Sequence, residues 1–237
     1  MKILVIVAHP DDEVLGMGGT ISKYCRNGHD VKIIIMATGI FARRSSNFVN
    51  NREYETSHKT EKQMIQQVEK LRQHAKKSAK IMGVSKIEFF DFPDNEMDKV
   101  SLLEVVKTIE KTIANFKPDM VYTHSQHDVN VDHRILYEAT LVATRPVPGS
   151  KIKKVMSFEI PSSTEWYFPS QFAPNVFEDI SKDLIKKKNA LKAYKTEIRK
   201  FPHPRSSDAL EVIAKKWGTV SGFMAAEAFT LVRQLNS

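Results

Sequence analysis

Residues 5–13, Val-Ile-Val-Ala-His-Pro-Asp-Asp-Glu, are the stretch from which the fold of this chain can be predicted. An apolar run from Ile3 to Val7 has the length and β-branching of a strand that is buried on both faces. Pro10 cannot donate a hydrogen bond to a sheet, so the strand should end before it. Three carboxylates follow, and they suit the positive N-terminal end of a helix. The stretch therefore predicts a buried strand that turns sharply into a helix.

The turn between this strand and helix carries residue types that bind metals. His9 and Asp12 project from it within reach of a common point, and imidazole with carboxylate is a frequent ligand pair. Asp11 lies beside them and is available to take a proton from a bound water. The alternative interpretation is a satisfied turn histidine followed by acids that only cap the helix. Three adjacent carboxylates repel one another and exceed what capping needs, which favours the metal site.

Strand and helix patterns alternate through the first 143 residues. We expect strands at residues 3–7, 31–36, 87–90 and 120–123, and helices at residues 14–26, 64–82, 102–116 and from about 132. This alternation is typical of an α/β fold with a parallel sheet covered on both faces. Ligands of such sheets bind beyond the carboxyl ends of the strands, where this sequence has polar residues, namely His9, Thr38, Asp91 and His124.

A second polar cluster, residues 124–134, follows the fourth expected strand. His133, in the first turn of the next helix, can complete a site of two imidazoles and one carboxylate with His9 and Asp12. Three protein ligands leave open positions for water and substrate, which is the catalytic arrangement. Asp128, Asn130 and Asp132 are candidates to orient the imidazoles or to hold substrate. The alternative is a polar loop with incidental histidines.

Two histidines and one carboxylate also form the iron site of ferrous oxygenases. Three observations count against that class. The local spacing is His-x-x-Asp, the expected scaffold is a parallel α/β sheet, and Asp11 is a spare carboxylate beside the metal. A base next to a metal-bound water indicates hydrolysis.

Length and composition describe an ordinary globular protein of 237 residues, 41% of them hydrophobic. We expect one domain over residues 1–237. No apolar run reaches the ~20 residues that span a membrane, and the N-terminus does not resemble a signal peptide. The single cysteine, Cys25, excludes an intramolecular disulfide framework and fits the cytoplasm. The polar segment from Gly39 to about Ser57 is longer than the usual connection, which indicates a functional loop.

The net charge of +8 favours anionic small molecules as partners. Much of the excess lies between Lys182 and Lys200, where apolar residues keep helical spacing. The lysines of this segment are therefore expected on the solvent face of a helix. No aromatic platform or nucleic-acid recognition motif accompanies them, so we expect no nucleic-acid partner.

Several motifs together resemble those of the LmbE-like, or PIG-L, deacetylases. The two specific ones are Ala-His-Pro-Asp-Asp-Glu at 8–13 with Gly16, Gly18 and Gly19, and Asp-x-Asn-x-Asp-His-Arg at 128–134. Supporting likeness continues at residues 159–166, 172–177, 203–206 and 225–229. The resemblance therefore covers essentially the whole chain.

This resemblance implies a Rossmann-like three-layer sandwich with a mainly parallel sheet. It also implies a zinc-dependent hydrolase that removes N-acetyl groups from N-acetylglucosamine units of small acetylated amino sugars. Carried over by motif, the zinc ligands are His9, Asp12 and His133, and the general base is Asp11. Mn²⁺ and Fe²⁺ remain open as alternatives to Zn²⁺. A homo-oligomer is possible.

The sequence departs from the family pattern at two positions. Some members have histidine where this chain has Asn130, so the donor to the oxyanion is open among Asn130, His124 and His127. Ala-Thr-Gly at 37–39 also replaces the usual Thr-Asp-Gly, which leaves the sugar undefined. Arg134 and Arg205 are candidates to contact substrate through their forked guanidinium groups. Arg134 can equally be a structural partner of Asp128.

Two other functions compete with deacetylation. The glycines at 16, 18 and 19 weakly match a nucleotide-binding loop, but the acids ahead of them would repel a pyrophosphate. A non-catalytic sugar-binding relative is the other alternative. The complete set of ligand and base positions argues against it.

Overall fold

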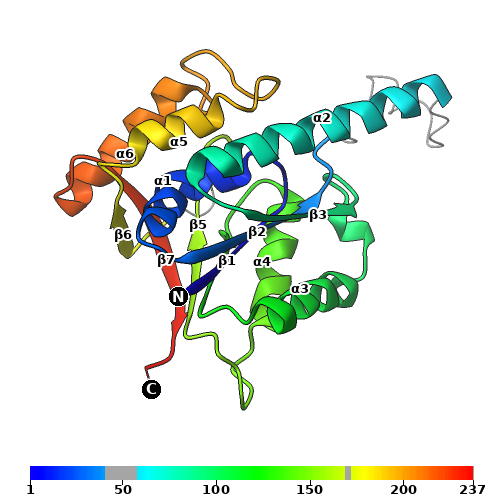
Figure 1. Ribbon diagram of the computed structural model, residues 1–237, viewed down its shortest axis with the longest axis horizontal. Helices are drawn as coiled ribbons and strands as arrows, with labels where there is room; N and C mark the ends of the chain where they lie inside the picture. Colours follow the sequence, from blue (N-terminus) through cyan, green and yellow to red (C-terminus); the bar gives the residue numbers. More distant parts are fainter. Residues whose placement is uncertain (41–57, 169–171, 237) are drawn as a thin grey trace.

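The structure is a computed structural model that describes residues 1–40, 58–168 and 172–236, so most of the loop expected at 39–57 lies outside the described residues. One sheet of seven strands runs through this part of the chain in the order β3-β2-β1-β4-β5-β7-β6 (Figure 1). Its strands are β1 (Lys2–Val7), β2 (Asp30–Ala37), β3 (Lys86–Phe92), β4 (Met120–His124), β5 (Lys154–Phe158), β6 (Val176–Asp179) and β7 (Ala226–Gln234).

The helices connect these strands, and α1, α2 and α3 end at the residues at which the sequence predicts them to end. They are α1 (Asp12–Arg26), α2 (His58–Met82), α3 (Leu102–Phe116), α4 (Val131–Ala143), α5 (Leu184–Leu191) and α6 (Ser207–Ser221). Two 3-10 turns, η2 (Met97–Lys99) and η3 (Thr164–Trp166), follow β3 and β5. In the described part of the chain, no helix combines the length and the apolar character that crossing a lipid bilayer requires.

Strands β1 to β5 are all parallel to one another, and β7 pairs antiparallel with both β5 and β6, so among the strands of the described residues β7 alone runs in the opposite direction. The expected mainly parallel α/β sheet is therefore confirmed. The chain builds outward from β1 in both directions, so the strand order reverses between β1 and β4. In parallel α/β sheets this switch point opens a crevice at the carboxyl ends of the strands. His9 and His124 lie at this crevice.

Successive side chains of β1 enter two different cores, as the two-residue period of a strand requires. Ile3, Val5 and Val7 pack in the core beneath α1, α2 and α5. Leu4 and Ile6 pack in the core beneath α3 and α4. Helices thus cover both faces of the sheet, which makes the three layers visible in Figure 1.

Helix α1 lies very close to the sheet because it lacks side chains at key positions. A Cβ atom at Gly16 would lie 2.4 Å from the Phe158 ring, and one at Gly19 would lie 2.7 Å from Ile180. The helix is also kinked at Met17, whose φ and ψ are −147° and 26°. Close approach to the sheet therefore explains these glycines.

The lysine-rich segment differs from its prediction in two respects. Helix α5 covers only Leu184–Leu191, and Lys187 is 4% exposed rather than on the solvent face. Its ammonium group donates to the Leu15 carbonyl (2.9 Å) and to Glu227 (2.6 Å). Because the kink in α1 frees that carbonyl, it offers the lysine a buried partner that periodicity does not reveal.

Candidate active site

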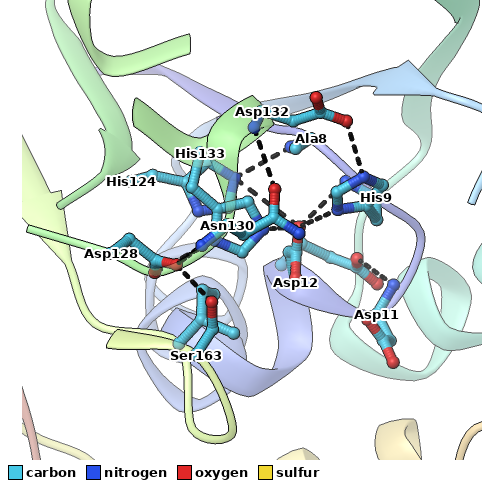
Figure 2. Close-up of polar contacts among 12 residues, drawn as sticks. Ala8, His9, Asp11, Asp12, His124, Asp128, Asn130, Asp132, His133 and Ser163 are labelled. Atoms are coloured by element: carbon cyan, nitrogen blue, oxygen red, sulfur yellow. Dashed lines mark hydrogen bonds and ion pairs between the residues drawn. The ribbon is translucent and has the colours of Figure 1, made fainter. Parts of the chain in front are cut away.

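The three residues predicted as metal ligands lie together at the switch point of the sheet (Figure 2). Asp12 Oδ2 is 3.5 Å from His9 Nδ1 and 3.3 Å from His133 Nε2. His9 follows β1, Asp12 opens α1, and His133 lies in the first turn of α4. One donor atom of each residue lies within 4.8 Å of the others, a spacing that can hold a metal ion. We call these three residues the cradle.

Two donor atoms of the cradle are buried without a hydrogen-bond partner among the described residues. They are Asp12 Oδ1 and His133 Nε2. A buried acceptor that is left unpaired costs roughly 1–3 kcal/mol, more when it is charged. A cation between the three side chains would satisfy both atoms, and two imidazole nitrogens with one carboxylate oxygen suit Zn²⁺. The residues present therefore fit a metal ion.

Two further carboxylates contact the outer nitrogens of the cradle histidines. Asp128 Oδ2 is 3.0 Å from His133 Nδ1, and Asp132 Oδ2 is 3.0 Å from His9 Nε2. Contacts of this kind fix the tautomer and orientation of a ligating imidazole. Each histidine then points its other nitrogen toward Asp12.

The loop after β3 also contacts His9, and sequence reasoning missed it. Asp94 Oδ1 is 3.2 Å from His9 Nε2. The backbone N–H groups of Asn95 and Met97 donate to the Asp132 carboxylate at 2.7 and 3.0 Å. The signal was present in the turn at residues 92–95, which follows a strand at the catalytic edge of the sheet.

Asp128 is held by the segment that follows β5. Ser163 and Thr164 both donate to its carboxylate, Thr164 at 2.7 Å. Burial alone would raise the pKa of Asp128, but His133, the Ser163 hydroxyl and the backbone N–H group of Asn130 outweigh it and hold that pKa below its ordinary value. Asp128 is therefore ionised beside His133. Both hydroxyl residues belong to the 159–166 motif, to which the sequence assigned no role.

Asp11 has the most unusual backbone of the site. Its φ is 104°, a left-handed conformation that costs a non-glycine residue on the order of 1–3 kcal/mol. Its side chain makes no capping hydrogen bond to α1. The carboxylate instead accepts from Arg205 Nη1 at 3.2 Å. Burial raises the pKa of Asp11 to about 7, against the opposing charge of Arg205.

Arg205 thus contacts Asp11, whereas the sequence proposed it for substrate. Its Nε atom also donates to Ser162 Oγ at 2.9 Å. The guanidinium group is 29% exposed, so one edge of it still faces solvent. A substrate group reaching the site can therefore meet Arg205 beside the carboxylate of Asp11.

His124 stacks on His133 with ring centroids 3.9 Å apart. Its Nε2 atom accepts from the backbone N–H of Ala8 at 2.8 Å, so its proton lies on Nδ1. Burial and the neighbouring His133 lower its pKa well below the ordinary value. His124 is thus a neutral ring that is fixed at the end of β4.

Asn130 and Arg134 are already engaged in protein contacts. The Asn130 side chain caps α4 by accepting from Asp132 N at 2.9 Å, and it donates to Asn95 at 2.6 Å. Arg134 donates to the backbone carbonyl groups of Asp128 and Val129. These contacts fit the structural alternative for Arg134, with the carbonyl of Asp128 as partner in place of its carboxylate.

Opposing effects also set the charge state of the cradle itself. Burial raises the pKa of Asp12, but His133, His9 and His124 outweigh it and hold that pKa well below its ordinary value. Burial lowers the pKa of His9 and of His133, and the surrounding carboxylates outweigh it in both cases. The cradle therefore carries an ionised carboxylate between two imidazoles whose pKa values are raised, and a cation that binds there would replace the proton on each ring nitrogen that it contacts.

Known proteins that are similar to this chain in sequence or fold include several deacetylases. Diacetylchitobiose deacetylase of Thermococcus kodakarensis is 27% identical over 241 residues, covering 98% of this chain and 83% of that protein. The match to the structure of N,N'-diacetylchitobiose deacetylase from Pyrococcus horikoshii covers 98% of this chain and 84% of that chain, with a TM-score of 0.75 and 22% identity. The match to the structure of the zinc-inhibited form of teicoplanin deacetylase Orf2 covers 100% of this chain and 100% of that chain, with a TM-score of 0.72 and 16% identity.

The family model described as PIG-L, GlcNAc-PI de-N-acetylase, matches residues 4–144, which is more than half of the chain. This range contains most of β1, β2 to β4, α1 to α4 and all three residues of the cradle. The match agrees with the resemblance that the sequence motifs indicate. The chain therefore belongs to the PIG-L family of deacetylases.

Proposed function

We propose that this protein is a metal-dependent hydrolase that removes the N-acetyl group from an N-acetylglucosamine-type sugar derivative. One observation carries the proposal. Two imidazoles and a carboxylate converge at the switch point of the sheet, where Asp12 Oδ1 and His133 Nε2 are buried without a hydrogen bond to any described residue. Membership of a deacetylase family gives this arrangement its reaction class.

His9, Asp12 and His133 would hold the ion through two nitrogens and one carboxylate oxygen. Zn²⁺ suits this donor set, and Mn²⁺ or Fe²⁺ are alternatives. When bound, the ion would polarise the acetamide carbonyl and lower the pKa of water. Asp128 and Asp132 orient the two imidazoles from outside, and Asp94 supports His9 from the same side.

Asp11 acts as the general base in this proposal. It removes a proton from the attacking water while the water oxygen bonds to the acetamide carbon. When the carbon–nitrogen bond breaks, Asp11 returns the proton to the departing amine, and acetate and the free amino sugar leave. Arg205 favours the ionised form of Asp11 through its contact at 3.2 Å.

The relatives support a small acetylated sugar as the substrate. The Thermococcus kodakarensis relative is named for its substrate, diacetylchitobiose. The absence of the usual aspartate at Thr38 leaves the sugar itself to be found by experiment. Arg205, partly exposed beside the base, offers a forked donor to hydroxyl, phosphate or carboxylate groups of the substrate.

Release of acetate tests the proposal directly. Purified protein is stripped with a chelator, reloaded with one equivalent of Zn²⁺, Mn²⁺ or Fe²⁺, and assayed on free, nucleotide-linked and aglycone-linked N-acetylglucosamine. Excess zinc is a separate arm, because a related deacetylase has a zinc-inhibited form. We expect metal-dependent acetate release from at least one substrate class. Tight binding of NAD without acetate release from any class would replace the proposal with the nucleotide-binding alternative.

A further inference from the structure

We infer that Glu13 and Tyr194 are positioning residues that hold the backbone of Asp11 in its left-handed conformation. The inference rests on the proposed role of Asp11 as general base. It concerns two side chains that touch neither the cradle nor the Asp11 carboxylate, and so it adds a support for the base that the proposed mechanism does not include.

The backbone of Asp11 is fixed on both sides. Its N–H group donates to Glu13 Oε2 at 3.1 Å. Its carbonyl group accepts from the N–H groups of Val14 and Leu15 at 3.1 and 2.9 Å. The second pair of contacts starts α1, whereas the contact with Glu13 holds the N–H side of a residue whose φ is 104°.

Glu13 is held in turn by a residue from the far end of the chain. Its Oε1 atom accepts from the Tyr194 hydroxyl at 2.5 Å, and both side chains are fully buried. Tyr194 lies just beyond α5, in the same segment of the chain that leads to Arg205. This segment therefore reaches Asp11 twice: through Tyr194 and Glu13 at the backbone, and through Arg205 at the carboxylate.

The arrangement differs from ordinary helix capping. A capping residue commonly uses its own side chain to accept a backbone N–H group of the first turn. Asp11 stands at the capping position without doing so. Glu13 holds the N–H group of Asp11, and the Asp11 carboxylate stays available for proton transfer. The contact between Glu13 and Tyr194 explains how a strained backbone persists at this position.

Tyr194→Phe is the sharpest test, because it removes a single hydroxyl and keeps the ring. The matched control is Tyr24→Phe, which removes the hydroxyl of another buried tyrosine whose partner, the Tyr122 hydroxyl at 2.6 Å, lies away from the site. Both variants are made as full chains and loaded with the metal that supports activity. Small displacements of a catalytic group can cost about 10²-fold in rate, so we expect Tyr194→Phe to lower kcat by roughly 10-fold with KM and metal content unchanged. Tyr24→Phe should keep the wild-type kcat.

Glu13 provides a second, conservative comparison. Glu13→Gln keeps an oxygen for the Asp11 N–H group and a polar atom for Tyr194, so it should retain most of the activity. Glu13→Ala removes both contacts and should lower kcat by about 10²-fold. A residue needed only for packing would not distinguish Gln from Ala in kcat once both variants are folded and carry metal.

Hydrogen–deuterium exchange of the peptide spanning residues 8–15 tests the positioning without relying on turnover. Exchange in this peptide should rise in Tyr194→Phe and Glu13→Ala and stay at the wild-type level in Tyr24→Phe. Wild-type exchange and wild-type kcat in Tyr194→Phe would overturn the inference and leave the proposed function standing. Increased exchange in a protein that releases no acetate from any substrate would support the positioning and sink the proposed function.

Discussion

Helix α1 has a buried group of charges at each of two places, and the two groups differ in how completely they are paired. At its start lies the cradle. At its kink lie Lys187, Glu227 and the backbone of residues 15–20, which we call the kink cluster. There Glu227 accepts from the N–H groups of Gly19 and Thr20 at 2.9 and 2.6 Å, and Lys187 donates to Leu15 and Glu227.

The two groups differ in whether their buried polar atoms have protein partners, and this difference indicates what each group does. In the kink cluster the ion pair replaces backbone hydrogen bonds that the kink in α1 removes, and both charged side chains have protein partners. In the cradle, Asp12 Oδ1 has no hydrogen-bond partner among the described residues, and His133 Nε2 lies 3.3 Å from Asp12 Oδ2 without forming a hydrogen bond. Since the cost of an unpaired buried group persists only where something compensates it, the first group supports the fold and the second is where we propose that an ion binds.

Breaking the kink cluster should have the largest effect on stability. Lys187→Met leaves the Glu227 carboxylate buried without its cation, and such a loss destabilises by about 3–5 kcal/mol. Urea unfolding measures the change. Lys188→Met is the matched control, because its partner Glu211 is partly exposed, and its loss should be far smaller. Equal losses in the two variants would contradict the structural role of the kink cluster.

Asp11→Asn should lower catalytic activity without lowering stability, the reverse of what we expect for Lys187→Met. We expect kcat to fall by about 10²-fold or more, because an amide cannot accept the proton. Metal content should be unchanged, since Asp11 is outside the cradle, and unfolding should show none of the loss expected for Lys187→Met. Acetate release, metal analysis and urea unfolding on one preparation measure all three. Undiminished turnover would exclude Asp11 as the base.

Metal binding should stabilise the protein through the cradle alone. At a free metal concentration of 100 times Kd, the expected gain is about 2.7 kcal/mol, measured as a rise in Tm. Asp12→Ala should abolish this rise. Lys187→Met should keep it from a lower starting Tm, which would show that the two groups of charges act independently. A rise that survives Asp12→Ala would place the ion elsewhere.

Asp128→Asn tests the contact that orients His133. Loss of a carboxylate behind a ligating histidine weakens metal binding by roughly 10–100-fold. Competition with a chelator of known affinity measures the change. The control is Asp91→Asn, because the Asp91 side chain is 75% exposed and pairs with Arg72 on the surface. This variant should bind metal as the wild type does.

The smallest effect is expected at an exposed ion pair. Lys188 and Lys215 lower the pKa of Glu211 to about 2, from 4.5. A carboxyl whose pKa is lowered by folding stabilises the protein above its unfolded pKa and loses that contribution as the pH falls toward its folded pKa. Glu211→Gln should therefore be slightly less stable than wild type at pH 6, and the difference should vanish near pH 2. A stability difference between the two proteins that grows as the pH falls would contradict this prediction.

The sequence predicts β1 to β4 well because the signals of these strands are local, whereas β5, β6 and β7 were not among the expected strands. Branched apolar runs and the Asn-Gly and Gly stop signals locate β1, β2 and α1 to within a few residues. The cradle was also predictable, since each of its residues follows a strand or opens a helix at the same edge. Contacts between distant segments were not. Periodicity cannot show that the kink frees a carbonyl for Lys187, or that Tyr194 reaches Glu13.

The candidate substrate contacts show the same limit. The amide of Asn130 suits a donor to substrate, and the structure adds a contact that the residue type does not reveal, because Asn130 caps α4. The guanidinium group of Arg205 suits a substrate ligand, and the structure adds its contact with Asp11. Residue type restricts what a side chain can bind, but the partner depends on which segments the fold brings together.

The position of the cradle between β1 and β4 also dictates when it can form. His9 and Asp12 leave the ribosome early, and His133 is made more than a hundred residues later. The ligand set is therefore incomplete throughout synthesis of the first half of the chain. The proposed ion can bind at the complete cradle only after β4 has paired with β1. A prematurely terminated product that lacks His133 therefore carries the first two ligands without the third.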